Sequence, residues 1–146
     1  MTRVPQEGQW DLLEDCGPFA RHAAAIYIAR DAHLKDGKAR FGFRVEPHHC
    51  NLRPHCHGGM LATFLDVALA RGLRVLAQVE PPLPTISMSV DFMSPAPLES
   101  WVEAFVSLDR LGASTGFVSA YVHADGALVM RGSGVFRHFT KKRAEA

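Results

Sequence analysis

Residues suited to acyl-transfer chemistry lie in the middle of the chain. His57, Gly58 and Gly59 begin a long apolar segment, and one carboxylate, Asp66, interrupts it. If the segment is a helix, its first glycines expose backbone N–H groups that suit a developing oxyanion. A carboxylate two turns further along, in a mostly apolar setting, suits proton transfer or attack on water. The pattern therefore indicates an acyl-transfer site.

Asp66 also has a purely structural interpretation. An unpaired carboxylate in a protein core costs free energy, so a core aspartate needs a hydrogen-bond partner or access to water. Asp66 is too far into the segment to cap a helix. Thr63, one turn earlier on the same face, is the partner that the sequence offers. The residue pattern alone leaves the structural and the functional interpretations open.

Several potential metal ligands precede the apolar segment, namely His48, His49, Cys50, His55, Cys56 and His57. Their types suit zinc, but the sequence has no second pair of closely spaced ligands, and the spacing fits no zinc finger. We therefore expect no metal, and these residues are interpreted as part of a loop. Asn51, in the same loop, has a turn-forming role as its alternative to a functional one.

Hydropathy periodicity predicts the elements that position these residues. We expect helices over 18–32 and about 59–78, and strands over 39–47, 85–93, 100–111, 115–124 and 127–139. Asp125 and Gly126 predict a tight hairpin turn. A helix that is apolar on nearly every side must be surrounded, and only a sheet is available. The expected fold class is α+β: a five-stranded, curved antiparallel sheet wrapped around a long central helix.

Length and composition set the broader limits. The 146 residues fit one domain, 1–146, with 1–17 as a polar lead-in and 140–146 as a flexible tail. The formal net charge of +1 and the lack of a long basic run argue against nucleic acid as a partner. No segment has the apolar length of a membrane span or a signal peptide. Three cysteines form no even disulfide framework, so we expect a cytoplasmic protein.

The pattern N51-x5-H57-G58-G59-x6-D66 is followed by "TISMSVDFMSPAP" and "DRLGASTGFVSAYVHADGALVMRGSGVF". Together these segments resemble the PaaI-like branch of the hotdog-fold acyl-CoA thioesterases. The likeness covers about residues 41 to 139. It implies a hotdog-fold homodimer with active sites at the dimer interface, with dimers often paired into tetramers. It also implies an acyl-CoA substrate, hydrolysis of the thioester, no metal or organic cofactor, and no membrane partner.

The resemblance further implies catalytic roles. Asn51 and His57 would come from one subunit and Asp66 from the other. The backbone N–H of Gly58 would polarise the thioester carbonyl with help from Asn51, and His57 would orient the acyl or thiol end. Asp66 would act as general base on water, or as nucleophile through an acyl anhydride. Thr85 would help to hold the water.

The substrate-binding positions implied by the resemblance are Gly59, Arg110, Gly112, Ser114 and Arg137. CoA would lie along the surface near 110–114, with Arg110 and Arg137 facing its phosphates. The chain departs from the family pattern at one place. Relatives usually carry glycine three residues after the Asn51 position, where this chain has Pro54, so the loop has a stiffer backbone.

Other functions remain compatible with the expected fold. The main alternative is a non-catalytic protein that binds acyl-CoA or another acyl ligand, because fold does not fix function. A buried acid at Asp66 has no purpose in such a protein. A hydratase or dehydratase would need a different placing of histidine and acid. The acyl group stays open between aromatic, short-chain and medium-chain types.

Overall fold

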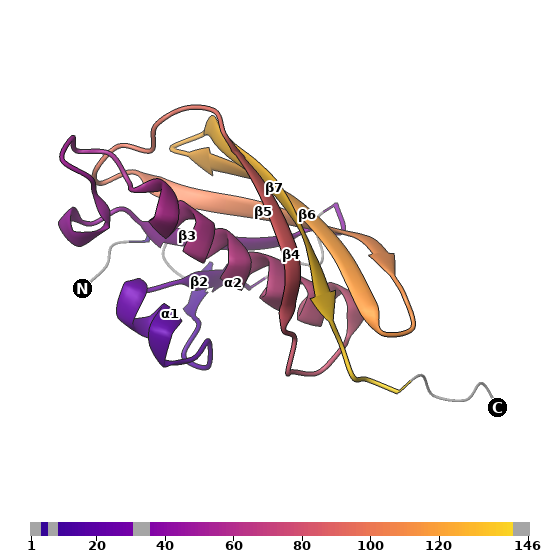
Figure 1. Ribbon diagram of the computed structural model, residues 1–146. Helices are drawn as coiled ribbons and strands as arrows, with labels where there is room; N and C mark the ends of the chain where they lie inside the picture. Colours follow the sequence, from indigo (N-terminus) through magenta and orange to yellow (C-terminus); the bar gives the residue numbers. More distant parts are fainter. Residues whose placement is uncertain (1–3, 6–8, 31–35, 142–146) are drawn as a thin grey trace.

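One long helix lies against one antiparallel sheet in the computed structural model, which describes residues 4–5, 9–30 and 36–141 (Figure 1). The strands are β1 Trp10–Leu12, β2 Tyr27–Ala29, β3 Ala39–Arg44, β4 Thr85–Phe92, β5 Trp101–Leu111, β6 Thr115–Ala124 and β7 Ala127–Arg137. The helices are α1 Pro18–Ala23, the 3-10 turn η1 Pro47–His49, and α2 Gly58–Ala77.

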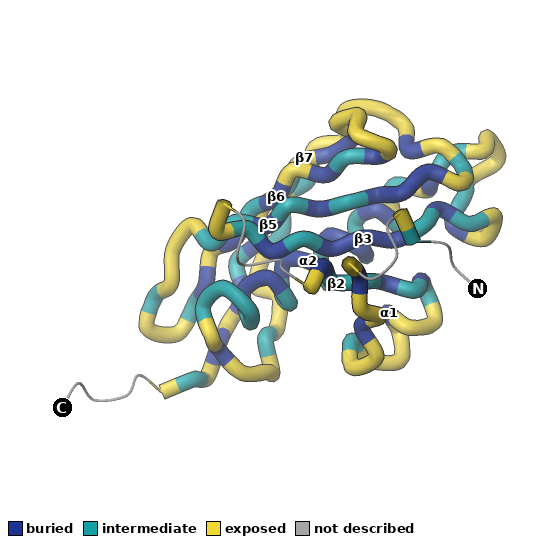
Figure 2. Tube along the Cα trace, turned by 180° about the vertical axis from the view of Figure 1, so that it is seen from behind, coloured by how far each residue is buried: buried dark blue, intermediate teal, exposed yellow. Residues whose placement is uncertain are grey.

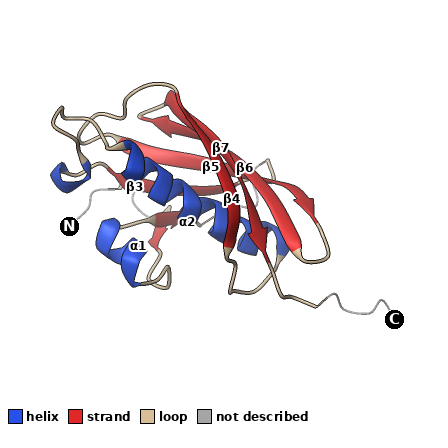
Figure 3. Ribbon diagram, in the orientation of Figure 1, coloured by secondary structure: helices blue, strands red, loops and turns tan. Residues whose placement is uncertain are grey.

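The sheet has seven strands in the order β1-β2-β3-β5-β6-β7-β4. Every neighbouring pair is antiparallel, and α2 crosses one face of the sheet (Figure 3). The expected α+β hotdog arrangement is confirmed. The expected number of five strands is wrong, because β1 and β2 extend the sheet beyond β3. The strand β1 lies within the stretch expected to be a polar lead-in.

The helix expected over 18–32 is much shorter. Pro18 occupies its first turn, as proline favours, but α1 ends at Ala23. Beyond it, Tyr27 and Ile28 pair with β3, because β-branched and aromatic side chains fit a half-buried sheet surface. Residues 31–32 of the expected helix lie outside the described residues.

One face of α2 forms the centre of the core. Its buried residues are Leu61, Phe64, Leu65, Ala68, Leu69, Gly72 and Leu73. They face buried side chains of the sheet such as Val102, Val106 and Phe136, and Figure 2 shows long buried stretches along β3, β5 and β6. Burial of each Leu or Phe side chain stabilises the folded state by roughly 1.5–3 kcal/mol. This packing holds α2 at a fixed height over the sheet.

The opposite face of α2 is not enclosed by the sheet. Thr63, Asp66, Val67, Ala70 and Arg74 are only partly buried there. The expectation that the sheet surrounds α2 on nearly every side is therefore wrong for the single chain. Asp66 lies on this open face and does not bear the cost of a core carboxylate. No helix in the described part of the chain, α2 included, has the length and apolar character needed to cross a membrane.

The edge strand β4 carries an irregularity that turns Thr85 toward α2. The register shifts between Thr85 and Ser87. Thr85 pairs with Phe136, whose side chain is in the core. Ser87, two residues later, pairs with Val135, which directly precedes Phe136 in β7. Because adjacent strand residues point to opposite faces, Thr85 and Ser87 face opposite sides. Strict alternation from the sequence places them on the same side, so the bulge is what aims Thr85 at the helix.

His49 fastens the loop before α2 to the chain before β2. Its buried ring accepts a hydrogen bond from the Glu46 N–H at Nδ1 (2.9 Å) and donates one from Nε2 to the Ala23 carbonyl (2.8 Å). The first bond needs a ring nitrogen without a proton. Burial lowers the pKa of His49 below its ordinary value of 6.5. The neutral ring is therefore part of the folded structure.

We expect acid to weaken the fold through His49. The unfolded chain binds a proton at this histidine near pH 6.5, and the folded chain does so only at lower pH. The stability that the neutral ring contributes is thus complete above this pH and is lost as the pH falls below it. His49→Gln should flatten the fall in the free energy of unfolding between about pH 7 and pH 5, measured by urea unfolding. His22→Gln, at an exposed histidine, is the control, and equal pH slopes for wild type and His49→Gln would contradict the expectation.

Candidate active site

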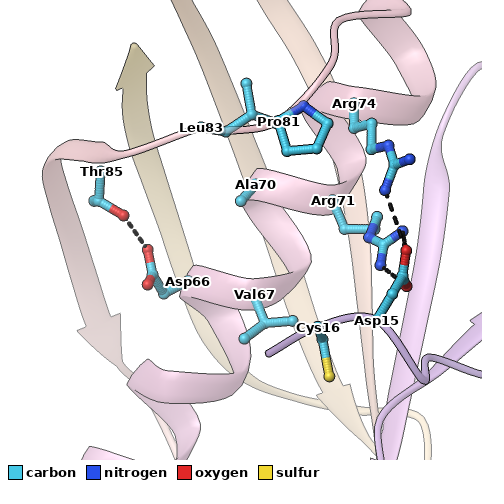
Figure 4. Close-up of a pocket in the computed structure, with 10 residues that line it drawn as sticks. All are labelled: Asp15, Cys16, Asp66, Val67, Ala70, Arg71, Arg74, Pro81, Leu83 and Thr85. Atoms are coloured by element: carbon cyan, nitrogen blue, oxygen red, sulfur yellow. Dashed lines mark hydrogen bonds and ion pairs between the residues drawn. The ribbon is translucent and has the colours of Figure 1, made fainter. Parts of the chain in front are cut away.

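Asp66 and Thr85 meet across the open face of α2. The Thr85 hydroxyl donates a hydrogen bond to Oδ1 of Asp66 at 2.7 Å (Figure 4). Thr63, the partner expected from helix spacing, instead donates its hydroxyl to the Gly59 carbonyl at 2.9 Å. Within the described residues the second oxygen, Oδ2 of Asp66, has no hydrogen-bond partner. This arrangement orients the carboxylate and leaves one oxygen free to react.

The Asp66–Thr85 pair lines a pocket of about 390 Å³. The other lining residues are Asp15, Cys16, Val67, Ala70, Arg71, Arg74, Pro81 and Leu83. The sequence interpretation missed the two arginines, although their spacing after Asp66 places them near the same helix face. Nothing in the sequence pattern points to Asp15, which reaches the pocket from the segment before α1. We call this pocket the acid pocket.

The other group of candidate residues surrounds the start of α2. The first turn of a helix leaves backbone N–H groups without helical partners. Here His57 serves two of them: its Nδ1 accepts from Gly59, and its carbonyl accepts from Met60 as well as from Leu61, whose bond is the first regular bond of the helix. The Gly58 N–H has no partner among the described residues. It is therefore the one amide of this turn that is left for a ligand.

The same bonds define the state of His57. Because the Gly59 N–H can only donate, Nδ1 of His57 is the acceptor at 2.8 Å, and the proton of a neutral ring sits on Nε2. The ring is exposed, so this Nε2–H can donate to a substrate. The Gly59 amide is already used. A Cβ on Gly59 would lie 3.1 Å from Nδ1 of His57, so glycine there keeps the ring in place.

Gly58 and Asn51 line a second pocket, of about 290 Å³, which we call the amide pocket. Its remaining lining residues are His55, Cys56, Leu61, Phe92, Met93, Ser94, Pro95 and Ala96. Oδ1 of Asn51 accepts a hydrogen bond from the Arg53 N–H at 3.0 Å, so Asn51 does form a turn. Its amide nitrogen has no partner in the described part of the chain and can still donate. The turn-forming and functional roles of Asn51 are therefore compatible.

The "MSPAP" segment after β4 holds the loop of the amide pocket. The Cys56 N–H donates to the Ala96 carbonyl at 2.8 Å, and the Leu98 N–H donates to the Pro54 carbonyl at 2.9 Å. Pro54 thus takes part in this attachment through its carbonyl, which a proline retains. The link explains physically why the histidine–glycine motif and this segment occur together.

Cys56 is a rival nucleophile by position, since it lines the amide pocket beside Gly58. Burial raises the pKa of its thiol to about 12, with a smaller contribution from nearby Cys50. The thiolate is the reactive form of cysteine, so at neutral pH this side chain is a poor nucleophile. Asp66 is therefore the stronger candidate for the reactive group of these pockets.

The expected CoA-binding positions gather at the far end of the sheet. The turn between β5 and β6 carries Gly112 and Ser114, and the end of β7 carries Arg137. His138 joins them: its Nε2 donates to the Gly112 carbonyl, and its backbone N–H donates to the Ser114 carbonyl, both at 2.9 Å. Arg137 lies over the Phe139 ring, and Arg110 is exposed. Thr85 pairs with Phe136, so the backbone of this end of β7 adjoins the acid pocket, whereas the Arg137 side chain points to the opposite face of the sheet.

The metal alternative gains little support from the histidines. In the part of the chain that the structure describes, potential ligands of three residues meet at one place, Glu46 with His48 and His49. Both ring nitrogens of His49 are already engaged by backbone groups. A metal ion there would have to displace one of these bonds.

The acid pocket and the amide pocket do not merge in one chain. No residue lines both. Gly58 and Asp66 are separated by two turns of α2, which corresponds to about 12 Å along the helix axis. One thioester carbonyl cannot touch both groups of the same chain, since each contact requires about 3 Å. A single chain thus holds two separate halves of the expected site.

Comparison with known proteins agrees with this fold. The candidate esterase PA0474 of Pseudomonas aeruginosa is 34% identical over 125 residues, covering 86% of each chain. The Escherichia coli PaaI protein from the phenylacetic acid degradation operon has a similar structure, with a TM-score of 0.71, 20% identity, and coverage of 86% of this chain and 87% of that one. The structure of a hypothetical thioesterase from Streptococcus pneumoniae with coenzyme A has a TM-score of 0.69 and 14% identity. The match covers 86% of this chain and 98% of that one.

The family assignment rests on the central part of the chain. Residues 54–130 match the family model of the thioesterase superfamily. This stretch is more than half of the chain and includes Gly58, Asp66 and Thr85. The prediction of a thioester hydrolase on a hotdog fold is confirmed at the level of the family. The chain belongs to the thioesterase superfamily.

Proposed function

We propose that this protein is an acyl-CoA thioesterase whose reaction centre is shared between two subunits. The observation that carries the proposal is the Asp66 carboxylate, held by Thr85 at the wall of a pocket with one oxygen unpaired. A thioester hydrolase needs such a group to activate water or to attack the carbonyl. The unpartnered amide of Gly58 supplies the complementary oxyanion donor.

A dimer formed through β4 would bring the two half-sites together. The strand β4 is a free edge, and its Ile86 and Phe92 are 56% and 52% exposed. Long apolar edges of this kind favour pairing with another strand. Thr85 lies at one end of β4 beside Asp66, and Phe92 lies at the other end beside Gly58. Antiparallel pairing of two β4 strands about a twofold axis would set Thr85 of one subunit near Phe92 of the other.

In the shared site the thioester carbonyl oxygen would accept a hydrogen bond from the Gly58 N–H. The free amide nitrogen of Asn51 would add a second donor, and the Nε2–H of His57 would orient the acyl or thiol end. These groups are fixed before substrate arrives, so they stabilise the oxyanion without reorganisation. Removing one donor of this kind costs roughly 10²–10³ in rate in other acyl-transfer enzymes.

Asp66 from the other subunit has two possible roles. As general base, its Oδ2 takes a proton from water while the water oxygen adds to the carbonyl carbon. The tetrahedral intermediate then expels the CoA thiolate, which recovers the proton from Asp66. As nucleophile, Asp66 attacks the carbonyl carbon and forms an acyl anhydride as the C–S bond breaks and the CoA thiolate leaves. Water then cleaves the anhydride, which returns the Asp66 carboxylate and gives the free acid and one proton, and that proton balances the thiolate. In both routes the Thr85 hydroxyl orients the carboxylate through its donated bond and has lone pairs left to hold the water.

The CoA part of the substrate would lie on the basic edge formed by Arg110, Arg137 and the turn around Gly112 and Ser114. Guanidinium groups suit phosphates because they offer several N–H donors in a fixed plane. The related Streptococcus pneumoniae structure contains coenzyme A on the same fold, which supports CoA as the carrier here. The Gly59 position would let the substrate pass close to the backbone.

Pairing of two dimers into a tetramer is also part of the proposal. The outer face of the sheet presents Phe117 and Tyr121, which are 39% and 53% exposed. Apolar side chains of this size on a sheet face favour contact with another subunit. No metal or organic cofactor is needed for the reaction described.

The direct test is thiol release from a panel of acyl-CoA esters with short, medium, long, benzoyl and phenylacetyl groups. We expect the purified protein to hydrolyse some members with multiple turnovers. Binding of CoA esters without thiol release from any member would overturn the enzyme proposal and favour the acyl-ligand binding protein.

A further inference from the structure

The acid pocket ends in a cluster of charges that the proposed mechanism does not use. Arg71 and Arg74 project from α2, and Asp15 approaches from the segment before α1 (Figure 4). The Asp15 carboxylate forms an ion pair with the guanidinium group of Arg71 and a second one, at 3.4 Å, with that of Arg74. Arg74 also lies 3.7 Å from the Glu80 carboxylate. The end of the pocket thus carries two cations held by carboxylates.

Arg71 retains hydrogen-bond donors that this cluster leaves unfilled. A guanidinium group has five N–H donors, and Arg71 donates to Asp15 through Nη1 and Nη2. Its Nε has no partner within the described residues. The side chain of Arg71 is 15% exposed, so a ligand bound in the pocket would displace the little water that reaches these donors. An acceptor oxygen from a ligand would gain from them, whereas a methyl group placed there would leave them unpaired.

The position of Arg71 relative to Asp66 sets where such an oxygen would lie. Arg71 follows Asp66 by five residues, which is about 7.5 Å of rise and ~140° of rotation along α2, so the two side chains leave the helix in different directions (Figure 4). The apolar side chains of Val67, Ala70 and Leu83 line the same pocket. The pocket thus offers a reactive carboxylate, a short apolar wall and then hydrogen-bond donors.

We propose that the acyl group is compact and carries an acceptor oxygen, from a carboxylate or a hydroxyl, at its end away from the thioester. This inference rests on the proposed function, because it places the thioester at Asp66. Arg71 is the specificity-determining residue, with Arg74 beside it. Asp15 is more than half exposed and serves as the counter-ion that a substrate oxygen joins or displaces.

The test compares three CoA esters of equal length: hexanoyl-CoA, 6-hydroxyhexanoyl-CoA and adipoyl-CoA. Wild type should show a kcat/KM at least about tenfold higher for one of the two oxygen-bearing esters than for hexanoyl-CoA. Preference for adipoyl-CoA identifies a carboxylate as the source, and preference for 6-hydroxyhexanoyl-CoA identifies a hydroxyl. Arg71→Leu should abolish the preference, measured as the ratio of kcat/KM for the oxygen-bearing ester to kcat/KM for hexanoyl-CoA.

Two further variants control for a loss of folding. Arg71→Lys keeps the charge but loses the planar fork, so the preference should shrink without disappearing. Arg30→Leu breaks a comparable pair, Arg30 with Asp11 at 2.9 Å, which does not line the acid pocket, and should leave the preference unchanged. Equal kcat/KM for the three esters in wild type, or an unchanged preference in both Arg71 variants, would overturn this inference alone. Failure of wild type to hydrolyse any CoA ester would overturn the proposed function and this inference with it.

Discussion

An Asp66→Asn variant is expected to hydrolyse acyl-CoA about a thousandfold more slowly than wild type, within the roughly 10²–10⁴ range for loss of a general base. Asparagine has nearly the same size, and its amide oxygen can still accept the Thr85 hydroxyl bond. It cannot take a proton from water or form an acyl anhydride. The measurement is kcat for thiol release with the best ester of the panel. A kcat within about threefold of wild type would refute the role of Asp66 in catalysis.

Asp11→Asn provides the matched control for this variant. Asp11 is exposed, pairs with Arg30 at 2.9 Å and does not line the acid pocket. Its loss should leave kcat within about threefold, because an exposed ion pair contributes little. Equal melting temperatures and oligomeric states for both variants would assign the activity loss to chemistry rather than to unfolding.

The second large effect is expected from Gly58→Pro. Proline is favoured at the first position of a helix, and His57 before it has φ −61 and ψ 138, a conformation that suits a residue preceding proline. The substitution therefore keeps the start of α2 but deletes the amide donor and fills its place with a ring carbon. We expect kcat/KM to fall by about 10²–10³, as for loss of one oxyanion donor.

Gly58→Ala separates the donor from the added bulk. Alanine keeps the N–H, and its Cβ would lie 3.5 Å from the Phe92 ring, an ordinary contact. We expect Gly58→Ala to retain far more activity than Gly58→Pro at similar thermal stability. Similar activities for the two variants would show that the Gly58 N–H is not the oxyanion donor.

Several parts of this architecture follow from sequence pattern because they depend on local periodicity. The long apolar segment became α2, and alternation correctly located the four C-terminal strands. The short strands β1 and β2 escaped detection because they are held by pairing with β3 and with each other rather than by their own pattern. Pairing between distant segments is not visible in a local window.

In the candidate site, too, some residues could be predicted from local sequence pattern and others could not. The pattern of Gly58 and Asp66 marks both residues, and the free amide and the unpaired carboxylate oxygen agree with the expected chemistry. Thr85 could be assigned only by resemblance, because a one-residue bulge reverses the face that alternation predicts. Whether Asp66 is in the core or at the edge of the apolar face stayed open, because hydrophobicity all round α2 does not tell which face the sheet covers; the structure leaves Asp66 partly buried.

Subunit mixing tests the shared reaction centre most directly. Asp66→Asn and Gly58→Pro subunits are each expected to be nearly inactive, yet a mixed dimer would contain one site with an intact Asp66 and an intact Gly58. With random exchange, half of the dimers are mixed and each has one working site of two, so about a quarter of wild-type activity should return. Absence of recovery, with exchange confirmed by native mass spectrometry of differently tagged subunits, would contradict a site built from two chains.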